Sequence, residues 1–153
     1  MAAASAFPPG ARCVYVDSNI WIALLTAEAS LPAVRQWLAD EPGLLVTAEW
    51  TRAEIASALA IKCRRGEFGQ PLLTRMLRVW GQLENRLVRM LPAQSADFAQ
   101  AAQWCATASH ALRSGNALHL AVAARHQASH LATHDQRMLE FAPRLGLEPL
   151  VFR

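Results

Sequence analysis

Short runs of apolar residues alternate along the chain with longer segments in which apolar residues recur every three or four positions. The short runs are typical of buried strands, and the longer segments are typical of helices with one buried face. This pattern predicts strands at 13–16, 44–46, 88–91, 130–133 and 148–152. It predicts helices from about residue 18 onwards and then at 31–38, 50–65, 71–86, 95–111, 117–128 and 135–145. Strands that alternate with helices indicate an α/β fold with a mostly parallel central sheet.

The length and the cysteine content bound the organisation of the chain. Its 153 residues suit one domain, which we expect over residues 13–153 after a flexible N-terminal extension at 1–12. No run approaches the ~18 apolar residues of a membrane span, and the first residues lack the pattern of a secretory signal. Cys13, Cys63 and Cys105 are an odd number with wide gaps, which fits neither a disulfide framework nor a zinc site. We therefore expect a reduced, cytoplasmic protein.

The charge of the chain is unevenly distributed. There are 15 basic and 12 acidic residues, a net charge of +3, whereas segment 62–89 alone has seven basic residues against Glu67 and Glu84, a balance of +5. Lys62 is the only lysine, and arginine binds phosphate through a planar fork of donors. This asymmetry favours a nucleic-acid partner. The alternative is that the segment forms two ordinary solvated helix faces.

Several familiar catalytic and metal-binding motifs are absent from the sequence. It has no Gly-Lys-Ser/Thr of a phosphate-binding loop, no GxGxxG after the first strand and no GxSxG. His126, His130 and His134 are spaced four residues apart, but the predicted helix ends within that window, so we expect them to be unrelated. The tryptophans fall on apolar helix faces, and we expect all of them to pack in the core: Trp21, Trp37, Trp50, Trp80 and Trp104.

Acidic residues stand where predicted strands give way to helices. Asp17 follows the first strand, Asp135 follows the fourth, and Glu54 lies one turn into the helix after the second. Because the carboxyl ends of parallel strands meet at one edge of a sheet, we expect these carboxylates to share a crevice. Crowded carboxylates repel one another, and a hard divalent cation such as Mg²⁺ compensates their charge. The alternative is helix capping by Asp17 and Asp135, with a capping box from Thr51 to Glu54.

Four blocks of the sequence resemble the signature blocks of PIN domains, most closely those of the VapC-type toxins of bacterial type II toxin–antitoxin pairs. The blocks are VYVDSNIW at 14–21, TRAE at 51–54, LRSGNALHLA at 112–121 and LATHD at 131–135. The resemblance implies an α/β/α sandwich and an endoribonuclease that depends on Mg²⁺ or Mn²⁺. It also implies a homodimeric toxin that cleaves structured RNA, such as transfer or ribosomal RNA. A cognate antitoxin would neutralise it by covering the acidic site with its C-terminal segment.

The third block departs from the family's pattern at one position. The family reads Gly-Asp-Ala where this chain has asparagine between glycine and alanine, at 115–117. The resemblance therefore implies a catalytic quartet of Asp17, Glu54, Asn116 and Asp135 in which one carboxylate is replaced by its amide. Such an exchange attenuates or inactivates a nuclease. Deliberate inactivation of a toxic enzyme and a naturally weakened enzyme both explain it.

The resemblance also implies a role for each residue of the quartet and for two of its neighbours. Glu54 would ligate the metal or orient the attacking water, and Arg113 and Thr133 are candidate contacts to phosphate or water. The residues expected to hold the metal are Asp17, Asn116 and Asp135. Two alternatives concern Asn116: it could simply cap a helix, or it could mark a PIN-fold module that binds RNA or a protein partner without cleaving RNA.

Overall fold

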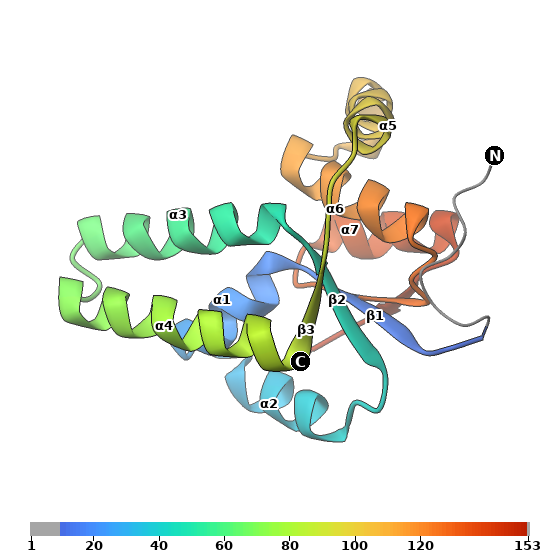
Figure 1. Cartoon of the computed structure of the whole chain (residues 1–153). Helices are drawn as coiled ribbons and strands as arrows, with labels where there is room; N and C mark the ends of the chain where they lie inside the picture. The colour runs from blue at the N-terminus through green and yellow to red at the C-terminus, as the bar shows by residue number, and fades with distance from the viewer. Residues whose placement is uncertain (1–9, 153) are drawn as a thin grey trace.

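The computed structural model describes residues 10–152, in which five strands alternate with seven helices (Figure 1). The strands are β1 (Cys13–Val16), β2 (Leu44–Ala48), β3 (Val88–Leu91), β4 (His130–Ala132) and β5 (Glu148–Leu150). The helices are α1 (Ser18–Thr26), α2 (Leu31–Asp40), α3 (Trp50–Arg64), α4 (Gln70–Leu87), α5 (Ser95–Ala106), α6 (Ser114–Arg125) and α7 (Gln136–Phe141). The predicted alternation of strands and helices is confirmed.

The strands form one sheet in the order β3-β2-β1-β4-β5, and each of its strand pairs within residues 10–152 is parallel. The expected α/β class with a mostly parallel sheet is confirmed. The chain adds β2 and β3 on one side of β1, and β4 and β5 on the other, so its winding reverses between β1 and β4. Such a reversal opens a crevice at the carboxyl ends of the two strands. Val16 and Ala132, which end these strands, are paired in register.

Helices cover both faces of the sheet, and the fully buried β1 contributes to the core on each face. Its side chains alternate, because successive residues of a strand point to opposite faces. Cys13 and Tyr15 belong to a core shared with α5, α6 and α7, whereas Val14 and Val16 belong to a core shared with α1, α2, α3 and α4. Figure 1 shows these two groups of helices on opposite sides of the strands. The expected α/β/α sandwich is confirmed.

The boundaries of α6 differ from the prediction, and the difference shifts the residues of the third sequence block. The predicted start at 117 is wrong, because α6 begins at Ser114 and contains Gly115 and Asn116 in its first turn. Glycine is a poor helix former, which is why the sequence pattern favours a later start. The alternative in which Asn116 caps the helix is also wrong, because the residue at the N-cap position is Arg113.

Residues 1–9 of the N-terminal extension expected at 1–12 lie outside the described residues, as does residue 153. Within the described part, Arg12 is anchored to the domain, because its guanidinium donates two hydrogen bonds of 2.6 and 2.9 Å to the carboxylate of Glu41. No helix within residues 10–152 has the length and apolarity needed to cross a membrane.

Candidate active site

Asp17 lies at the crevice where the winding of the sheet reverses, directly after β1. Its side chain is 2% exposed and makes no cap hydrogen bond to α1. Instead it accepts hydrogen bonds from Thr133 Oγ1 at 2.7 Å and from Ser18 Oγ at 3.3 Å. Asp17 therefore occupies the N-cap position of α1, as the capping alternative expects, but its side chain does not cap the helix. The hydrogen bonds from Thr133 and Ser18 hold its carboxylate in the crevice.

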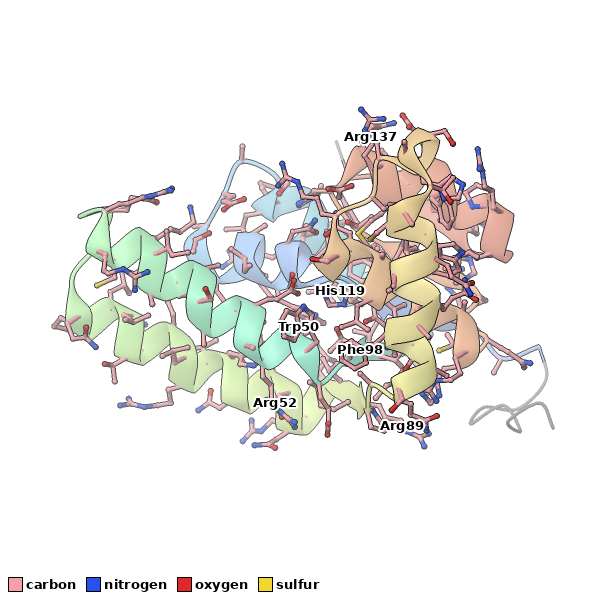
Figure 2. All side chains as sticks on the ribbon, turned by 90° about the horizontal axis from the view of Figure 1, so that it is seen from above. Trp50, Arg52, Arg89, Phe98, His119 and Arg137 are labelled. Atoms are coloured by element: carbon pink, nitrogen blue, oxygen red, sulfur yellow. The ribbon has the colours of Figure 1, made fainter. Side chains whose placement is uncertain are left out.

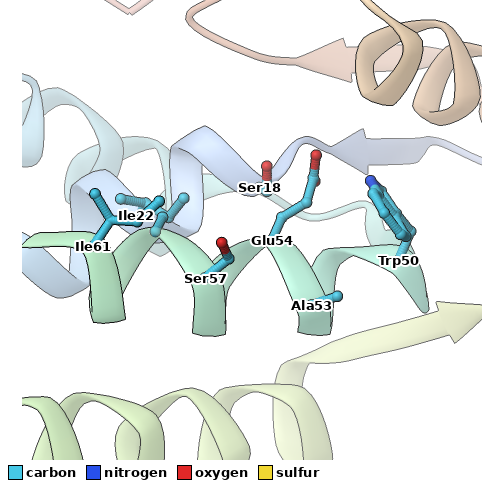
Figure 3. Close-up of a pocket in the computed structure, with 8 residues that line it drawn as sticks. Ser18, Ile22, Trp50, Ala53, Glu54, Ser57 and Ile61 are labelled. Atoms are coloured by element: carbon cyan, nitrogen blue, oxygen red, sulfur yellow. The ribbon is translucent and has the colours of Figure 1, made fainter.

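Glu54 projects toward Asp17 from the second turn of α3. The residue at the N-cap position of α3 is Glu49, so the capping box from Thr51 to Glu54 does not form; the hydroxyl of Thr51 is instead 2.7 Å from that of Thr47. Figure 3 shows the Glu54 side chain rising from α3 beside Ser18 and Trp50, which contribute to lowering the pKa of its carboxyl group.

His119 contacts both carboxylates from inside the domain, although the sequence analysis assigned no functional role to it. Its side chain is completely buried in α6. Nε2 is hydrogen-bonded to Glu54 Oε2 and lies 3.5 Å from Asp17 Oδ1. Nδ1 is 2.7 Å from the hydroxyl of Tyr15. The available signal was the helical spacing, because His119 lies one turn after Asn116 in the same helix.

Burial and mutual charge shift the pKa values of this trio in different directions. Burial, with a smaller contribution from the charge of Glu54, raises the pKa of Asp17 above its ordinary value. Burial also acts to raise the pKa of Glu54, but the hydrogen bond and charge of His119 outweigh it and lower the pKa. Burial acts to lower the pKa of His119, but Glu54 and Asp17 outweigh it and raise the pKa. The contact with His119 therefore favours the ionised form of the Glu54 carboxylate.

Thr133 and Asn19 tie the loop after β4 to the start of α1. Thr133 is 1% exposed; its hydroxyl donates to Asp17 and accepts from the amide of Asn19 at 3.0 Å and from the backbone N–H of Asp135 at 3.0 Å. Asn19 Oδ1 in turn accepts from the backbone N–H of His134 at 3.1 Å. The sequence reasoning missed Asn19, and it expected Thr133 to contact phosphate or water. The observed contact of Thr133 is with Asp17.

The other predicted site residues lie around this centre. Asp135 caps α7, because its Oδ1 accepts from the backbone N–H of Met138 at 3.0 Å; the capping alternative is confirmed for this residue. Asn116 is half-buried in the first turn of α6, and Arg113 is exposed at the start of that helix. The catalytic and metal-binding roles of these residues stay predictions.

One cluster among the described residues has the geometry to hold a metal ion. One ligand atom from each of Asp17, Glu54 and His119 lies within 4.8 Å of the other two. Carboxylate oxygens suit Mg²⁺, and an imidazole nitrogen also suits Mn²⁺ and other transition metals. Of the residues predicted to hold the metal, Asp17 belongs to this cluster. The three histidines at 126, 130 and 134 form no such group within residues 10–152.

The surface beside the cluster is hollowed on both sides of Trp50. A groove of about 450 Å³ runs along α3 past Glu54 and Ser18 (Figure 3). A second hollow of about 300 Å³ has Phe98 and Leu118 in its wall. The expectation that all tryptophans pack in the core is wrong for Trp50, which is 41% exposed because α3 begins there. In Figure 2, His119, Trp50 and Phe98 lie close together where α3 meets α5 and α6.

Comparisons with known proteins assign this architecture to a family and to a fold. The family model of the PIN domain matches residues 14–142, which includes β2, β3, β4, all of β1 except its first residue, and every residue of the cluster. No curated protein sequence matches the chain significantly. The resemblance of the four sequence blocks to PIN domains is thereby confirmed.

Solved structures with low sequence identity share the fold. Mycobacterium tuberculosis VapC20, described as a sarcin-ricin loop cleaving toxin, superposes with a TM-score of 0.66 at 19% identity, covering 83% of this chain and 93% of that one. VapBC2 from Rickettsia felis, solved with a DNA fragment from its promoter, gives 0.62 at 10% identity, covering 92% and 99%. FitAcB from Neisseria gonorrhoeae gives 0.61 at 17% identity, covering 90% and 96%.

Proposed function

Because this chain belongs to the PIN domain family, we propose that it is a metal-dependent endoribonuclease and the toxin of a type II toxin–antitoxin pair. The observation that carries the proposal is the pair of carboxylates from Asp17 and Glu54, buried or half-buried at the carboxyl edge of the sheet. Two carboxylates side by side in a crevice repel each other unless a cation compensates them. A site of this kind is suited to phosphodiester hydrolysis at a divalent metal.

The chemistry divides between the metal and the residues that surround it. A bound Mg²⁺ or Mn²⁺ would lower the pKa of a water molecule and neutralise charge on the scissile phosphate. Asp17 would hold the metal, with its orientation fixed by the hydroxyl of Thr133. Glu54 is ionised and would accept the proton of the attacking water or contribute a second oxygen ligand. Asp135 and residue 116 would complete the set from the neighbouring helix starts.

Asn116 accounts for an attenuated enzyme in this proposal. A carboxylate at this position would add a third negative charge for the metal, whereas the amide offers one neutral oxygen. Hard divalent cations bind more weakly when the charge of the ligand set falls. We therefore expect the chain as it stands to bind metal less tightly, and to cleave RNA more slowly, than its Asn116→Asp form.

The proposed substrate is a structured RNA, either a transfer RNA or a ribosomal RNA. One similar fold, VapC20, is described as a sarcin-ricin loop cleaving toxin. In this chain, Trp50 and Phe98 are 41% and 55% exposed beside the site, and aromatic faces stack on unpaired bases. Arginine side chains of segment 62–89 would contact the phosphate backbone outside the cleavage site.

The proposed partners are a cognate antitoxin and a second copy of the same chain, in the cytoplasm. Similar folds carry the names of toxin–antitoxin pairs, VapBC2 and FitAcB. A small protein that binds across the crevice would cover Glu54, which lines the groove along α3, and the buried Asp17 beside it. We expect the reading frame next to the gene to encode such a protein.

Cleavage of total cellular RNA tests the proposal. The chain and its Asn116→Asp form are compared with Mg²⁺, with Mn²⁺ and with EDTA, and Asp17→Asn serves as the inactive control. We expect discrete RNA fragments from the Asp form in the presence of metal, fewer from the unchanged chain, and none from the control. Absence of metal-dependent cleavage by the folded Asp form would refute the nuclease.

The second candidate function is a PIN-fold module that binds RNA or a protein partner without turnover. The observation that favours it is the amide at Asn116. A binding module predicts that both forms retain RNA in a gel-shift assay and that neither cleaves it with Mg²⁺ or Mn²⁺. The same samples therefore separate the two functions.

A further inference from the structure

We propose that His119 is the positioning residue of this site, and that its Nε2–H holds the carboxylate of Glu54 against that of Asp17. The two carboxylates are thereby presented together to a cation. This proposal rests on the metal-dependent function proposed above and adds a fifth residue to the four acidic positions of the site.

The first support is the place of the imidazole between the two carboxylates. His119 is 0% exposed, and its Nε2 is hydrogen-bonded to Glu54 Oε2 and lies 3.5 Å from Asp17 Oδ1. An ionised carboxylate only accepts hydrogen bonds, so Nε2 carries the proton of this contact. A single N–H group therefore faces both carboxylates from inside the domain.

The second support is that the ring is fixed from its other edge. Nδ1 is 2.7 Å from the hydroxyl of Tyr15, and the two rings meet edge to face with centroids 5.8 Å apart. That hydroxyl also accepts the backbone N–H of Ala48 at 3.1 Å, at the end of β2. A chain of hydrogen bonds thus runs from the central sheet through Tyr15 and His119 to Glu54. The imidazole cannot rotate without breaking it.

The third support is that α6 also leaves room for the carboxylate. Gly115 lies one helical turn before His119, on the same face of α6, because residues four apart are neighbours on a helix. A Cβ atom at Gly115 would lie 3.0 Å from Glu54 Oε1, which is tighter than ordinary contact. One face of α6 therefore provides the space for Glu54 at one turn and its hydrogen-bond donor at the next.

Direct ligation of the metal by His119 is a different role with a different signature. The hydrogen bond between Nε2 and Glu54 leaves no space for a cation between these two atoms. A positioning residue acts through Glu54, so any side chain that restores the donor also restores the site. A ligand would require an imidazole nitrogen on the metal and would show nitrogen coupling in the spectrum of bound Mn²⁺.

The test measures Mn²⁺ binding by the full chain and its variants, by electron paramagnetic resonance, without RNA. His119→Leu removes the donor, His119→Gln restores an N–H at the end of a side chain, and Tyr15→Phe removes the support of the ring. His110→Gln, away from the cluster, is the matched control. Loss of a residue that orients a metal ligand typically weakens metal binding by about 10–100-fold. We expect a loss of this size for Leu, a smaller loss for Phe, and near-normal binding for Gln and for the control.

Each outcome decides one proposal. Unchanged Mn²⁺ binding by the folded His119→Leu variant overturns the positioning role. Nitrogen coupling in the Mn²⁺ spectrum of the parent chain also overturns it, because it would mean that His119 ligates the metal. A Gln variant as weak as the Leu variant also overturns it. If His119→Leu fails to fold, as judged by circular dichroism, the Mn²⁺ binding of the His119→Gln and Tyr15→Phe variants decides the positioning role. A parent chain and Asn116→Asp form that bind no Mn²⁺ refute the proposed function itself.

Discussion

At the scale of single residues, Glu41 shows how one buried carboxylate makes stability depend on pH. The side chain of Glu41 is 2% exposed, and it accepts hydrogen bonds from Arg12, Trp37 and the backbone N–H of Gly43. The Arg12 hydrogen bond is the main cause that lowers the pKa of Glu41 to about 2. Because the pKa is lower in the folded chain, the stabilisation is complete above the unfolded pKa of about 4.5 and is lost as the pH falls toward 2.

We predict that Glu41→Gln lowers the free energy of unfolding by about 1–3 kcal/mol at pH 7. The difference between the variant and the parent shrinks below about pH 4.5 and is close to zero near pH 2. Urea unfolding at a series of pH values measures it, with the exposed Glu140→Gln as the control. A difference that stays the same from pH 7 to pH 3 would contradict the prediction.

Position 116 is the single residue at which the proposed metal site can be tested most directly. Asn116 lies in the first turn of α6, where a negative charge gains about 0.3–1 kcal/mol from the helix terminus, so the effect of Asn116→Asp without metal combines this gain with repulsion from the acidic cluster. The response to metal is free of that ambiguity. We predict that saturating Mg²⁺ stabilises the Asp form by about 1.4 kcal/mol more than the Asn form if the carboxylate tightens binding tenfold.

Thermal unfolding of both forms with EDTA and with Mg²⁺ measures this difference. Equal shifts in melting temperature for the two forms would remove position 116 from the metal site. Ca²⁺ in place of Mg²⁺ tests whether the response follows the cation or only the ionic strength.

At the scale of elements, α6 marks the limit of the sequence pattern. The pattern predicts a helix at 117–128, and the observed helix begins three residues earlier, at Ser114. The predicted helix leaves out Gly115 and Asn116, so the pattern does not place Gly115 one turn before His119 on the same helix face. This omission is one reason why His119 received no role, although the quoted sequence block contains it. Asp17 was predictable because a strand end locates it, and Glu54 because it lies one turn into the helix that follows the second strand.

A pair of glycines tests what α6 does for the site. Replacing a helical glycine by alanine normally stabilises a protein by about 0.5–1 kcal/mol, and Gly81 in α4 has open space for a Cβ atom. At Gly115 the Cβ would press on Glu54, whose carboxylate is hydrogen-bonded to His119. We predict that Gly81→Ala is stabilising in urea unfolding, that Gly115→Ala is not, and that only Gly115→Ala weakens Mn²⁺ binding.

Equal stabilisation by both alanines, with Mn²⁺ binding intact, would mean that Glu54 moves aside freely. The role of α6 as a wall of the site would then be wrong.

The hairpin of α3 and α4 extends to one side of the sheet in Figure 1 and carries most of the basic segment 62–89. Lys62 is paired with Glu67 and Glu28. Four of the exposed arginines of the segment are the better candidates for contact with RNA: Arg64, Arg65, Arg75 and Arg78. We predict that replacing these four by glutamine weakens RNA binding and reduces the slope of its salt dependence, because fewer counterions are released.

Filter binding at several salt concentrations measures both quantities. A double glutamine variant at Arg137 and Arg144, both exposed on the other side of the domain, is the control for loss of charge alone. The prediction is contradicted if the effect per charge removed is the same in both variants.

At the scale of the whole molecule, the fold class was predictable and the strand order was not. Alternating strands and helices indicate a parallel sheet because parallel strands need crossover connections. The pattern along the chain does not say which strands become neighbours. The contacts of the site depend on that choice: Thr133 reaches Asp17 across 116 positions, and His119 reaches Glu54 across 65. Such contacts follow from packing, and no local spacing encodes them.

The reactivity of the Cys13 thiol can be used to measure global unfolding of the domain. It is 1% exposed in the central strand, and burial raises the pKa of its thiol to about 11, so it reacts only when the domain unfolds. Cys63 and Cys105 are half-buried. We predict that a disulfide reagent labels these two in the folded chain, while Cys13 reacts at the rate of global unfolding. Labelling of three thiols at one rate without denaturant would contradict this.

The central place of β1 has a consequence for the making of the protein. The ribosome synthesises β1 first, yet one of its two neighbours in the sheet, β4, is among the last strands to be completed. A growing chain therefore contains Asp17 and Glu54 long before Thr133 and β4 exist to enclose them. An unfinished chain therefore cannot carry the assembled site. In the proposed toxin, activity would begin only after translation has passed the fourth strand. The time needed to synthesise the chain up to β4 is available for the antitoxin to be made.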